Sequence, residues 1–430
     1  MASSISMKAL QRADQLLGLA ACAALQPARW VREREAEYPA KRVLAIKFWG
    51  IGSLQLLTPA LATLRRRHPF AEITLLTLAG NAEFARGLGL VDHIVTLDVG
   101  TAGWVHVARR IVRLVRSLRA ARFDAVYDFE FFTRFSSVVS LLTRAPRRHG
   151  FASPSVWRGG FHTDTIVFNR YWHVSRNFRA LAGGEDGLNP TAHEVRAHGY
   201  TEHDEARTAL RLERAGIVDG EPYVVLNPNA GELSLERRWP AQNFIALARR
   251  FREREDWPVV LIGSASERGY VDTIRERVGD RRCVNLAGEL SMGELMALFA
   301  RSAVVVTNDS GPMHLAAAIG APTLGLFGPE TPVMYGPLGL RARAMYRPPA
   351  CSPCINVHDN KVASCIYGEP QCLVALEVER VHEEALALAL GNDFRFDLEP
   401  REERRPRHDE KDPRRDEKGP APDRRDPRAE

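Results

Sequence analysis

Two successive series of apolar strands and amphipathic helices restrict this chain of 430 residues to an α/β fold. In the first series we expect strands at residues 43–48, 73–78, 94–97 and 125–129, and helices at 54–67 and 105–118. Alternation at this spacing is typical of βαβ units, whose crossovers place the strands in a parallel sheet. The first half should therefore form a Rossmann-like domain.

The pattern begins again after residue 200. We expect strands at 223–228, 259–263, 303–306 and 323–327, and helices at 205–215, 243–252, 267–278 and 292–301. These elements predict a second doubly wound domain, with a ligand site in the cleft between the two domains. A late helix at 381–390 is expected to pack back across the first domain.

Changes in composition along the chain predict its domain limits. Residues 1–40 should form a helical extension, 41–200 the first domain, and 201–395 the second domain with a cysteine-containing loop at 348–373. Residues 396–430 are almost all Arg, Glu, Asp, Lys and Pro, and such a composition cannot bury apolar surface. We predict that this tail is disordered.

The net charge of +6 comes from basic residues spread along the whole chain, which favours anionic partners such as nucleotide diphosphates, acidic glycolipids or a membrane face. Nucleic acid is not expected, because no aromatic–basic stripe or known module is present. The apolar segment at 16–25 is shorter than the roughly 20 residues that span a bilayer, and Pro27 and a charged run follow it. We expect a cytoplasmic protein whose N-terminal amphipathic helix rests on the inner face of the cytoplasmic membrane.

The octapeptide Thr-Asn-Asp-Ser-Gly-Pro-Met-His at residues 307–314 is the most informative local pattern. It lies between an apolar strand and an Ala-rich helix, so Asp309 or Ser310 can cap the helix, and Gly311 lets a ligand approach the backbone. The first turn then offers free N–H groups and a positive dipole end to a phosphate, with His314 one turn further on. An ordinary capped strand–helix turn is the alternative interpretation.

Four segments in this order resemble glycosyltransferase family 9, which comprises the lipopolysaccharide heptosyltransferases and their relatives. The matching residues are Val43-Leu44-Ala45-Ile46-Lys47 with Gly50-Ile51-Gly52-Ser53 and Thr58-Pro59-Ala60-Leu61, then Asn227-Pro228 with Arg237-Arg238-Trp239-Pro240, then Thr307 to Ala317, then Leu326-Phe327-Gly328-Pro329. The resemblance covers residues 41–385. It implies a GT-B fold, a nucleotide-diphosphate sugar as donor substrate, inversion at the anomeric carbon, and no required metal or cofactor.

By this resemblance the donor binds the second domain. Its expected contacts are Asn229, Arg237, Glu267, Asn308, Asp309, Ser310, Gly311 and His314. Arg237 takes the position of a family lysine and would reach the diphosphate, for which a guanidinium is suited. The alternatives are a solvated basic turn for Arg237 and a carboxylate at a helix start for Glu267. Trp239 is expected to pack rather than to stack on the ligand.

On the acceptor side the sequence departs from the family. The loop with Gly50 and Gly52 ends in Ser53, where the family carries an Asp that is taken as the general base. A serine cannot accept the proton of a sugar hydroxyl without a base of its own. Asp128 and Glu130, at the end of a first-domain strand, are the candidate bases, and structural carboxylates paired with Arg134 are the alternative. Ser53 would then cap its helix and bind acceptor.

Four of the six cysteines, Cys351, Cys354, Cys365 and Cys372, lie in one loop with His358. Their thiolates are ligand types for tetrahedral zinc. Similar loops occur in the family, however, so we favour reduced or disulfide-paired structural cysteines and keep zinc as the alternative.

The sequence therefore predicts a glycosyltransferase that moves a sugar, such as a heptose, from a nucleotide-diphosphate donor to a cell-envelope glycan or lipid-linked acceptor. Two alternatives stay open. One is a nucleotide-sugar epimerase of the same fold, which would act on the donor alone. The other is a non-catalytic nucleotide-sugar-binding relative, which Ser53 makes credible.

Overall fold

The computed structural model describes residues 7–30, 39–100, 103–153, 156–184, 190–231, 234–355 and 364–391. In these ranges, none of the helices combines the length and the apolar character needed to traverse a lipid bilayer.

The first sheet has six parallel strands in the order β3-β2-β1-β4-β5-β6. Its strands are β1 (Arg42–Ile46), β2 (Glu72–Leu78), β3 (His93–Leu97), β4 (Ala125–Asp128), β5 (Arg147–Ala152) and β6 (Asp164–Val167). The order reverses between β1 and β4, so the sheet has a topological switch point there.

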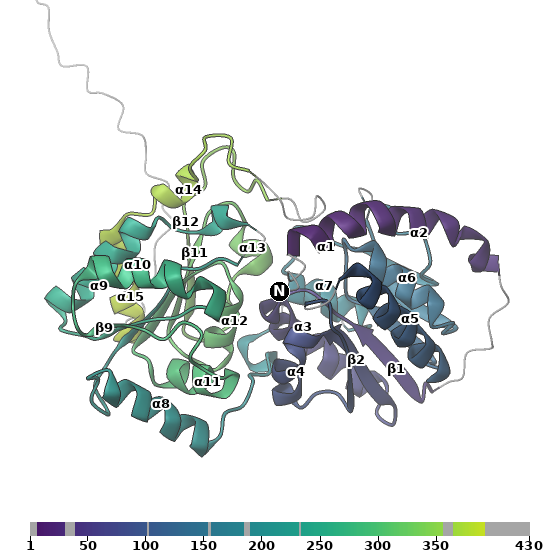
Figure 1. Cartoon of the computed structure of the whole chain (residues 1–430), viewed down its shortest axis with the longest axis horizontal. Coiled ribbons are helices and arrows are strands. Elements are labelled where there is room, and N and C mark those ends of the chain that lie inside the picture. Colours follow the sequence, from purple (N-terminus) through teal and green to yellow (C-terminus); the bar gives the residue numbers. More distant parts are fainter. Residues whose placement is uncertain are drawn as a thin grey trace, which may run out of the picture. The chain divides into compact units, whose positions relative to one another are not determined.

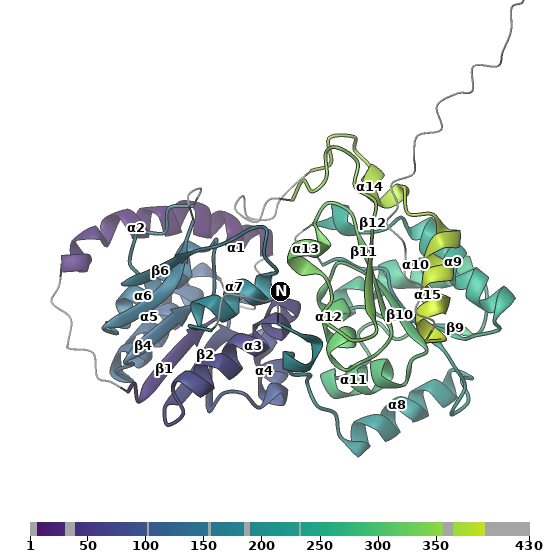
Figure 2. The ribbon, with the colours of Figure 1, turned by 180° about the vertical axis from the view of Figure 1, so that it is seen from behind.

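Helices cover both faces of this sheet, which explains why β1 is apolar at successive positions. Val43 and Ala45 share a core with α3 (Ile51–Arg67), α4 (Ala82–Leu88) and α7 (Val174–Leu181). Leu44 and Ile46 point to the other face and pack against α5 (Trp104–Ala120) and α6 (Arg134–Leu142). Figure 1 shows α5 and α6, and Figure 2 shows the sheet from behind.

The N-terminal extension is helical, in α1 (Met7–Ala13), η1 (Asp14–Gly18) and α2 (Leu19–Ala24), followed by a 3₁₀ turn, η2 (Gln26–Trp30). It packs on α6. The Asp14 carboxylate accepts hydrogen bonds from the backbone N–H groups of Arg134 (3.0 Å) and Phe135 (2.8 Å), and so caps α6. Cys22 is buried against Val138 in the same contact.

The second sheet repeats the first, with six parallel strands in the order β12-β11-β10-β7-β8-β9. Its strands are β7 (Val224–Asn227), β8 (Val259–Leu261), β9 (Cys283–Asn285), β10 (Val304–Asn308), β11 (Thr323–Phe327) and β12 (Ala342–Tyr346). The helices around it are α8 (Glu202–Arg214), α9 (Ala241–Arg254), α10 (Arg268–Val278), α11 (Met292–Arg301), α12 (Gly311–Ala318), α13 (Pro332–Tyr335) and α14 (Gln371–Val374). Its switch point lies between β7 and β10.

The last helix, α15 (Val378–Ala389), corrects one expectation. Val381 and Ala385 of α15 share a core with Phe251 of α9 and Val306 of β10. The helix therefore packs on the second sheet, and the prediction that it packs across the first domain was wrong. Its apolar stripe covers part of the second sheet itself.

The two sheets draw on separate parts of the chain, with strands at 42–167 and 224–346. On this basis we propose residues 41–200 and 201–395 as the two domains. The charged tail at 396–430 lies outside the described residues.

Candidate active site

The carboxyl ends of the strands at both switch points open into one pocket with a volume of about 520 Å³. From the first sheet it is lined by the loop after β1, including Gly50, Gly52 and Ser53, and by Phe131 and Phe132 after β4. The second sheet contributes residues after β7, β8 and β10, among them Asn229, Arg237, Glu267, Asp309, Ser310, Gly311 and His314. Ligands of doubly wound folds bind at such switch points.

Two helix N-termini meet at this pocket. A Cβ atom placed on Gly52, in the first turn of α3, would lie 2.9 Å from the Cα atom of Gly311, which begins α12. It would also lie 2.9 Å from Cδ2 of His314. Only a residue without a side chain at position 52 allows this approach. The positive ends of both helix dipoles are thereby directed at one site, which suits a diphosphate.

Neither helix has a side-chain cap, which corrects two expectations. The residue before α3 is Gly50, with a φ of 77°, so Ser53 lies inside the first turn and does not cap the helix. Ser310 precedes α12 but its hydroxyl does not cap it either, because it hydrogen-bonds Asn227 Nδ2 (2.9 Å) and Thr307 (3.1 Å) instead. In the described ranges, neither Ser53 nor Ser310 therefore caps the first-turn N–H groups of its helix.

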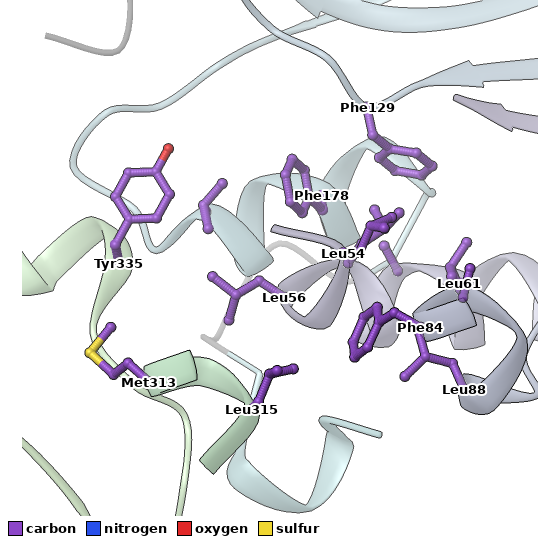
Figure 3. Packing of buried hydrophobic residues seen from close by; sticks show 14 of the residues in the cluster. Leu54, Leu56, Leu61, Phe84, Leu88, Phe129, Phe178, Met313, Leu315 and Tyr335 are labelled. Atoms are coloured by element: carbon purple, nitrogen blue, oxygen red, sulfur yellow. The ribbon is translucent and has the colours of Figure 1, made fainter. Parts of the chain in front are cut away.

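A cluster of buried apolar side chains lies beside the two helix starts. Leu56 of α3, Leu315 of α12 and Tyr335 of α13 belong to one buried cluster and also line the pocket (Figure 3). Burial, together with the charges of Glu330 and Asp309, raises the pKa of Tyr335 well above its usual value, so this phenol stays neutral.

Arg237 is held at the pocket by the second domain. Its Nη1 donates to the Asp309 carbonyl (3.0 Å) and carboxylate (3.3 Å), and its Nη2 donates to the Ala230 carbonyl (2.7 Å). Its Nε is buried without a hydrogen-bond partner among the described residues. The guanidinium is thus fixed in orientation, and these contacts use three of its five N–H groups.

Most of the other predicted donor contacts also line the pocket. The exception is Asn308, which is fully buried and donates to the Asn229 carbonyl (3.3 Å) while accepting from Trp239 N (2.9 Å). Trp239 is buried and donates through Nε1 to the Leu376 carbonyl (3.1 Å), so it packs as expected. Glu267 forms a capping box with Ser264, the helix-start role that was its alternative interpretation.

The two candidate bases differ in their surroundings. Asp128 is fully buried and accepts hydrogen bonds from Ser136 (3.0 Å), His162 (3.1 Å), the Glu130 N–H (3.1 Å) and Arg158. Burial alone would raise the pKa of Asp128, but Arg158 and His162 more than offset this and lower it. Its carboxylate is already occupied, and it is not among the residues that line the pocket.

Glu130 is also buried, but only one of its oxygens is occupied. Oε1 accepts from Lys47 Nζ (2.9 Å), Phe48 N (2.7 Å) and Trp49 N (3.1 Å). Oε2 has no hydrogen-bond partner among the described residues. Lys47 and Trp49 line the pocket, so Glu130 lies directly behind its wall. Within the described part of the chain the ion-pair partners of Glu130 and Asp128 are Lys47 and Arg158. Arg134 instead donates through Nε to the Trp157 carbonyl (3.1 Å).

A model of glycosyltransferase family 9 (heptosyltransferase) matches residues 111–363, more than half of the chain. The chain belongs to glycosyltransferase family 9. Lipopolysaccharide heptosyltransferase 2 of Escherichia coli K12 is 26% identical over 363 residues, 82% of this chain and 99% of the relative.

Two solved structures are similar to this family 9 glycosyltransferase. The E. coli ADP-heptose lipopolysaccharide heptosyltransferase II has 26% identity and a TM-score of 0.62, with 82% of this chain and 99% of the other covered. A family 9 glycosyltransferase from Veillonella parvula has 23% identity and a TM-score of 0.66, with 84% and 99% covered. The predicted GT-B fold and glycosyltransferase class are confirmed, and the epimerase alternative is not favoured.

Sequence reasoning about this glycosyltransferase missed Lys47 and Tyr335. Lys47 is 1% exposed, and its Nζ lies 5.9 and 5.7 Å from the ring centroids of Phe131 and Phe178. A lysine at the end of an apolar strand needs a buried partner, and Glu130 could have been sought on that ground. Nothing in the sequence pattern distinguishes Tyr335.

The cysteine loop follows β12. Cys372 is buried at the start of α14, and its burial raises its pKa to about 11, while Cys354 is exposed. All six cysteines are unpaired. Among the described residues no three His, Cys, Asp or Glu side chains are grouped to hold a metal ion, and His358 lies outside them.

Proposed function

We propose that this glycosyltransferase transfers a sugar from a nucleotide-diphosphate donor to a glycan or lipid-linked acceptor of the cell envelope, with inversion. The relatives named ADP-heptose and lipopolysaccharide heptosyltransferases support a heptose donor and a lipopolysaccharide-type acceptor. The observation that carries the proposal is the convergence of α3 and α12 on one pocket beside Arg237.

In this proposal the second domain stabilises the leaving group. As the bond between the anomeric carbon and the diphosphate oxygen breaks, negative charge grows on the diphosphate. The first-turn N–H groups of α12 and the Arg237 guanidinium supply fixed positive charge at that place. The Asp309 contacts keep Arg237 oriented, so no side chain has to reorganise during the reaction.

The first domain would activate the acceptor. Of the two predicted bases we now favour Glu130, because its Oε2 has no hydrogen-bond partner among the described residues whereas both Asp128 oxygens accept hydrogen bonds. The acceptor oxygen attacks the anomeric carbon on the side opposite the diphosphate, and its proton passes to Glu130. Lys47 positions this carboxylate, and Ser53 offers a hydroxyl to the acceptor. Attack from that side inverts the anomeric centre.

The donor would come from the cytoplasm, so we propose a cytoplasmic location.

The test of the proposed function is a thermal-shift screen of the chain against ADP-heptose, ADP, and sugars linked to UDP and GDP. A ligand that binds the folded state raises stability by about 2.7 kcal/mol at a hundredfold excess over its Kd. ADP-heptose should raise the unfolding temperature more than ADP does. The proposal fails if no nucleotide sugar stabilises the chain. Incubation with donor alone should leave the sugar unchanged, unlike in an epimerase.

A further inference from the structure

Helix α5 is strongly basic. It carries Arg109, Arg110, Arg113, Arg116 and Arg119 and no acidic residue. Arg110 pairs with Asp98, but the other four arginines have no ion-pair partner in the part of the chain that the structure describes. On an ordinary surface helix, charges of both signs are interspersed.

Exposed apolar side chains stand among these arginines. Trp104 is 49% exposed, Val105 63% and Val112 48%. The opposite side of α5 places Leu114 and Leu118 in the core beneath the first sheet, so the exposed apolar residues are not needed for packing there. A helix with unpaired arginines and exposed apolar residues on its outer face is typical of a membrane surface.

The N-terminal helix adds a second exposed apolar face. Leu16 is 73% exposed, Leu17 66% and Leu19 44%, although Asp14 anchors the same helix to the start of α6. This helix packs on α6, and α6 packs beside α5 on the same face of the first sheet. The contacts with α6 come from η1 and α2, and Figure 1 shows α2 beside α6.

Both exposed faces reach the edge of the sheet at which the pocket lies. Helices α5 and α6 follow β3 and β4, so each begins at the carboxyl edge of the first sheet. Trp104 opens α5, and Trp157, which is 47% exposed, accepts a hydrogen bond from Arg134 at the start of α6. Tryptophan is enriched where a protein meets the headgroup region of a bilayer.

We propose that the arginine face of α5 (Trp104, Val105, Arg109, Val112, Arg113, Arg116) and the leucine face of the N-terminal helix (Leu16, Leu17, Leu19) dock the protein on an anionic lipid bilayer. The arginines bind lipid phosphates, and the apolar side chains enter the headgroup boundary. The inference deepens the proposed function and rests on it for the lipid-linked acceptor. Docking at this edge presents such an acceptor to the first-domain side of the pocket.

Co-sedimentation of the full chain with lipid vesicles tests the arginine face. The vesicles contain phosphatidylcholine with or without phosphatidylglycerol. The test variant combines Arg109→Glu, Arg113→Glu and Arg116→Glu. The control combines Arg214→Glu, Arg277→Glu and Arg281→Glu, which make the same charge change at exposed arginines around the second sheet that lack an ion-pair partner among the described residues.

Wild type should sediment with the anionic vesicles, and less so as salt rises. The test variant should bind roughly tenfold or more weakly, and the control should bind close to wild type. Equal weakening of both variants would mean that net charge alone acts, and would overturn the proposal. The proposal would also be overturned if wild type bound neutral and anionic vesicles equally. A test variant that lost affinity for duplex DNA but kept its affinity for vesicles would overturn it as well.

A second variant, Leu16→Ser with Leu17→Ser, tests the leucine face. It should reduce vesicle binding severalfold even in high salt, because the apolar contribution is not screened. Its unfolding temperature should match wild type, since both side chains are exposed. Unchanged binding would exclude this face. Sugar transfer to a delipidated, water-soluble acceptor should be unaffected in all these variants, so failure of docking and failure of the proposed reaction are separable.

Discussion

Gly52 and Gly311 lie so close together that a Cβ atom on Gly52 would approach the Gly311 Cα to 2.9 Å. This contact joins the first turn of α3 to the first residue of α12, and so brings the positive ends of two helices to one pocket. The relationship depends on the absence of a side chain at Gly52, because a Cβ atom on Gly311 would lie 3.4 Å from the Gly52 N atom, an ordinary contact distance.

The substitution Gly52→Ala should therefore separate the two helix starts and lower kcat/KM at least tenfold, because small displacements of aligned groups are costly in catalysis. The measurement is steady-state transfer kinetics together with thermal unfolding. Gly269→Ala is the matched control. Gly269 also lies within a helix, and a Cβ atom there would meet nothing within 4 Å. The control should keep full activity; if Gly52→Ala does so too, the contact has no catalytic importance.

Arg237 should control donor binding. Arg237→Ala removes the fixed guanidinium and should raise the Kd for the nucleotide sugar tenfold or more, as titration calorimetry would show. Arg237→Lys introduces the residue that the resemblance to family 9 places there, and it should raise the Kd less than Arg237→Ala does. Arg214→Ala, at an exposed site, should bind as wild type does. Equal Kd values for wild type and Arg237→Ala would contradict the assigned role.

The base assignment predicts different outcomes at three positions. Glu130→Gln should lower kcat by roughly a hundredfold or more with little change in donor affinity, because it removes the proton acceptor. Ser53→Ala should retain most of kcat, since a hydroxyl does not serve as the base. Asp128→Asn should chiefly lower the unfolding temperature, because Arg158 would lose its buried partner. Full turnover in both Glu130→Gln and Asp128→Asn would exclude both carboxylates as the general base.

His173 should make stability depend on pH. Its Nδ1 accepts from Ser175 N (3.2 Å), so its Nε2–H donates to the Gly336 carbonyl (3.0 Å), and the ring is neutral. Burial lowers its pKa from 6.5 to about 4. Because the unfolded chain binds the proton more tightly, protonation of His173 favours unfolding. The full free energy of unfolding is therefore present above pH 6.5, and on the order of 3 kcal/mol of it is lost as pH falls toward 4.

The variant His173→Asn isolates this effect in urea unfolding at pH 7 and pH 5. Asparagine can still accept the Ser175 N–H bond, but it lacks the donor to Gly336 and does not titrate. We expect it to be less stable than wild type at pH 7 and to lose less stability between the two pH values. Identical pH dependence in both proteins would show that His173 is not the responsible group.

The fold was largely readable from the sequence because its signals are local. Buried parallel strands are short apolar runs, and the helices between them carry apolar stripes, so strands such as β1 and β11 and helices such as α11 were expected close to their observed bounds. The wrong prediction for α15 shows the limit of this reasoning. The apolar stripe of this segment predicts a helix but does not say which of the two sheets the helix covers.

The donor motif was readable for the same reason, since a polar turn between an apolar strand and a helix is a pattern in one short segment. What the sequence alone determined is thus the α/β class, the strands around both switch points and the strand–turn–helix segment at 307–314 that the pocket later includes. The strands β5, β6, β9 and β12 were not predicted. Only the tertiary structure decided that Gly52 meets Gly311 and that neither Ser53 nor Ser310 caps its helix. It alone also decided that, among the described residues, one Glu130 oxygen has no hydrogen-bond partner whereas both Asp128 oxygens have one. The reason is physical: each of these features depends on distances between groups from different elements, which packing sets and local sequence patterns do not.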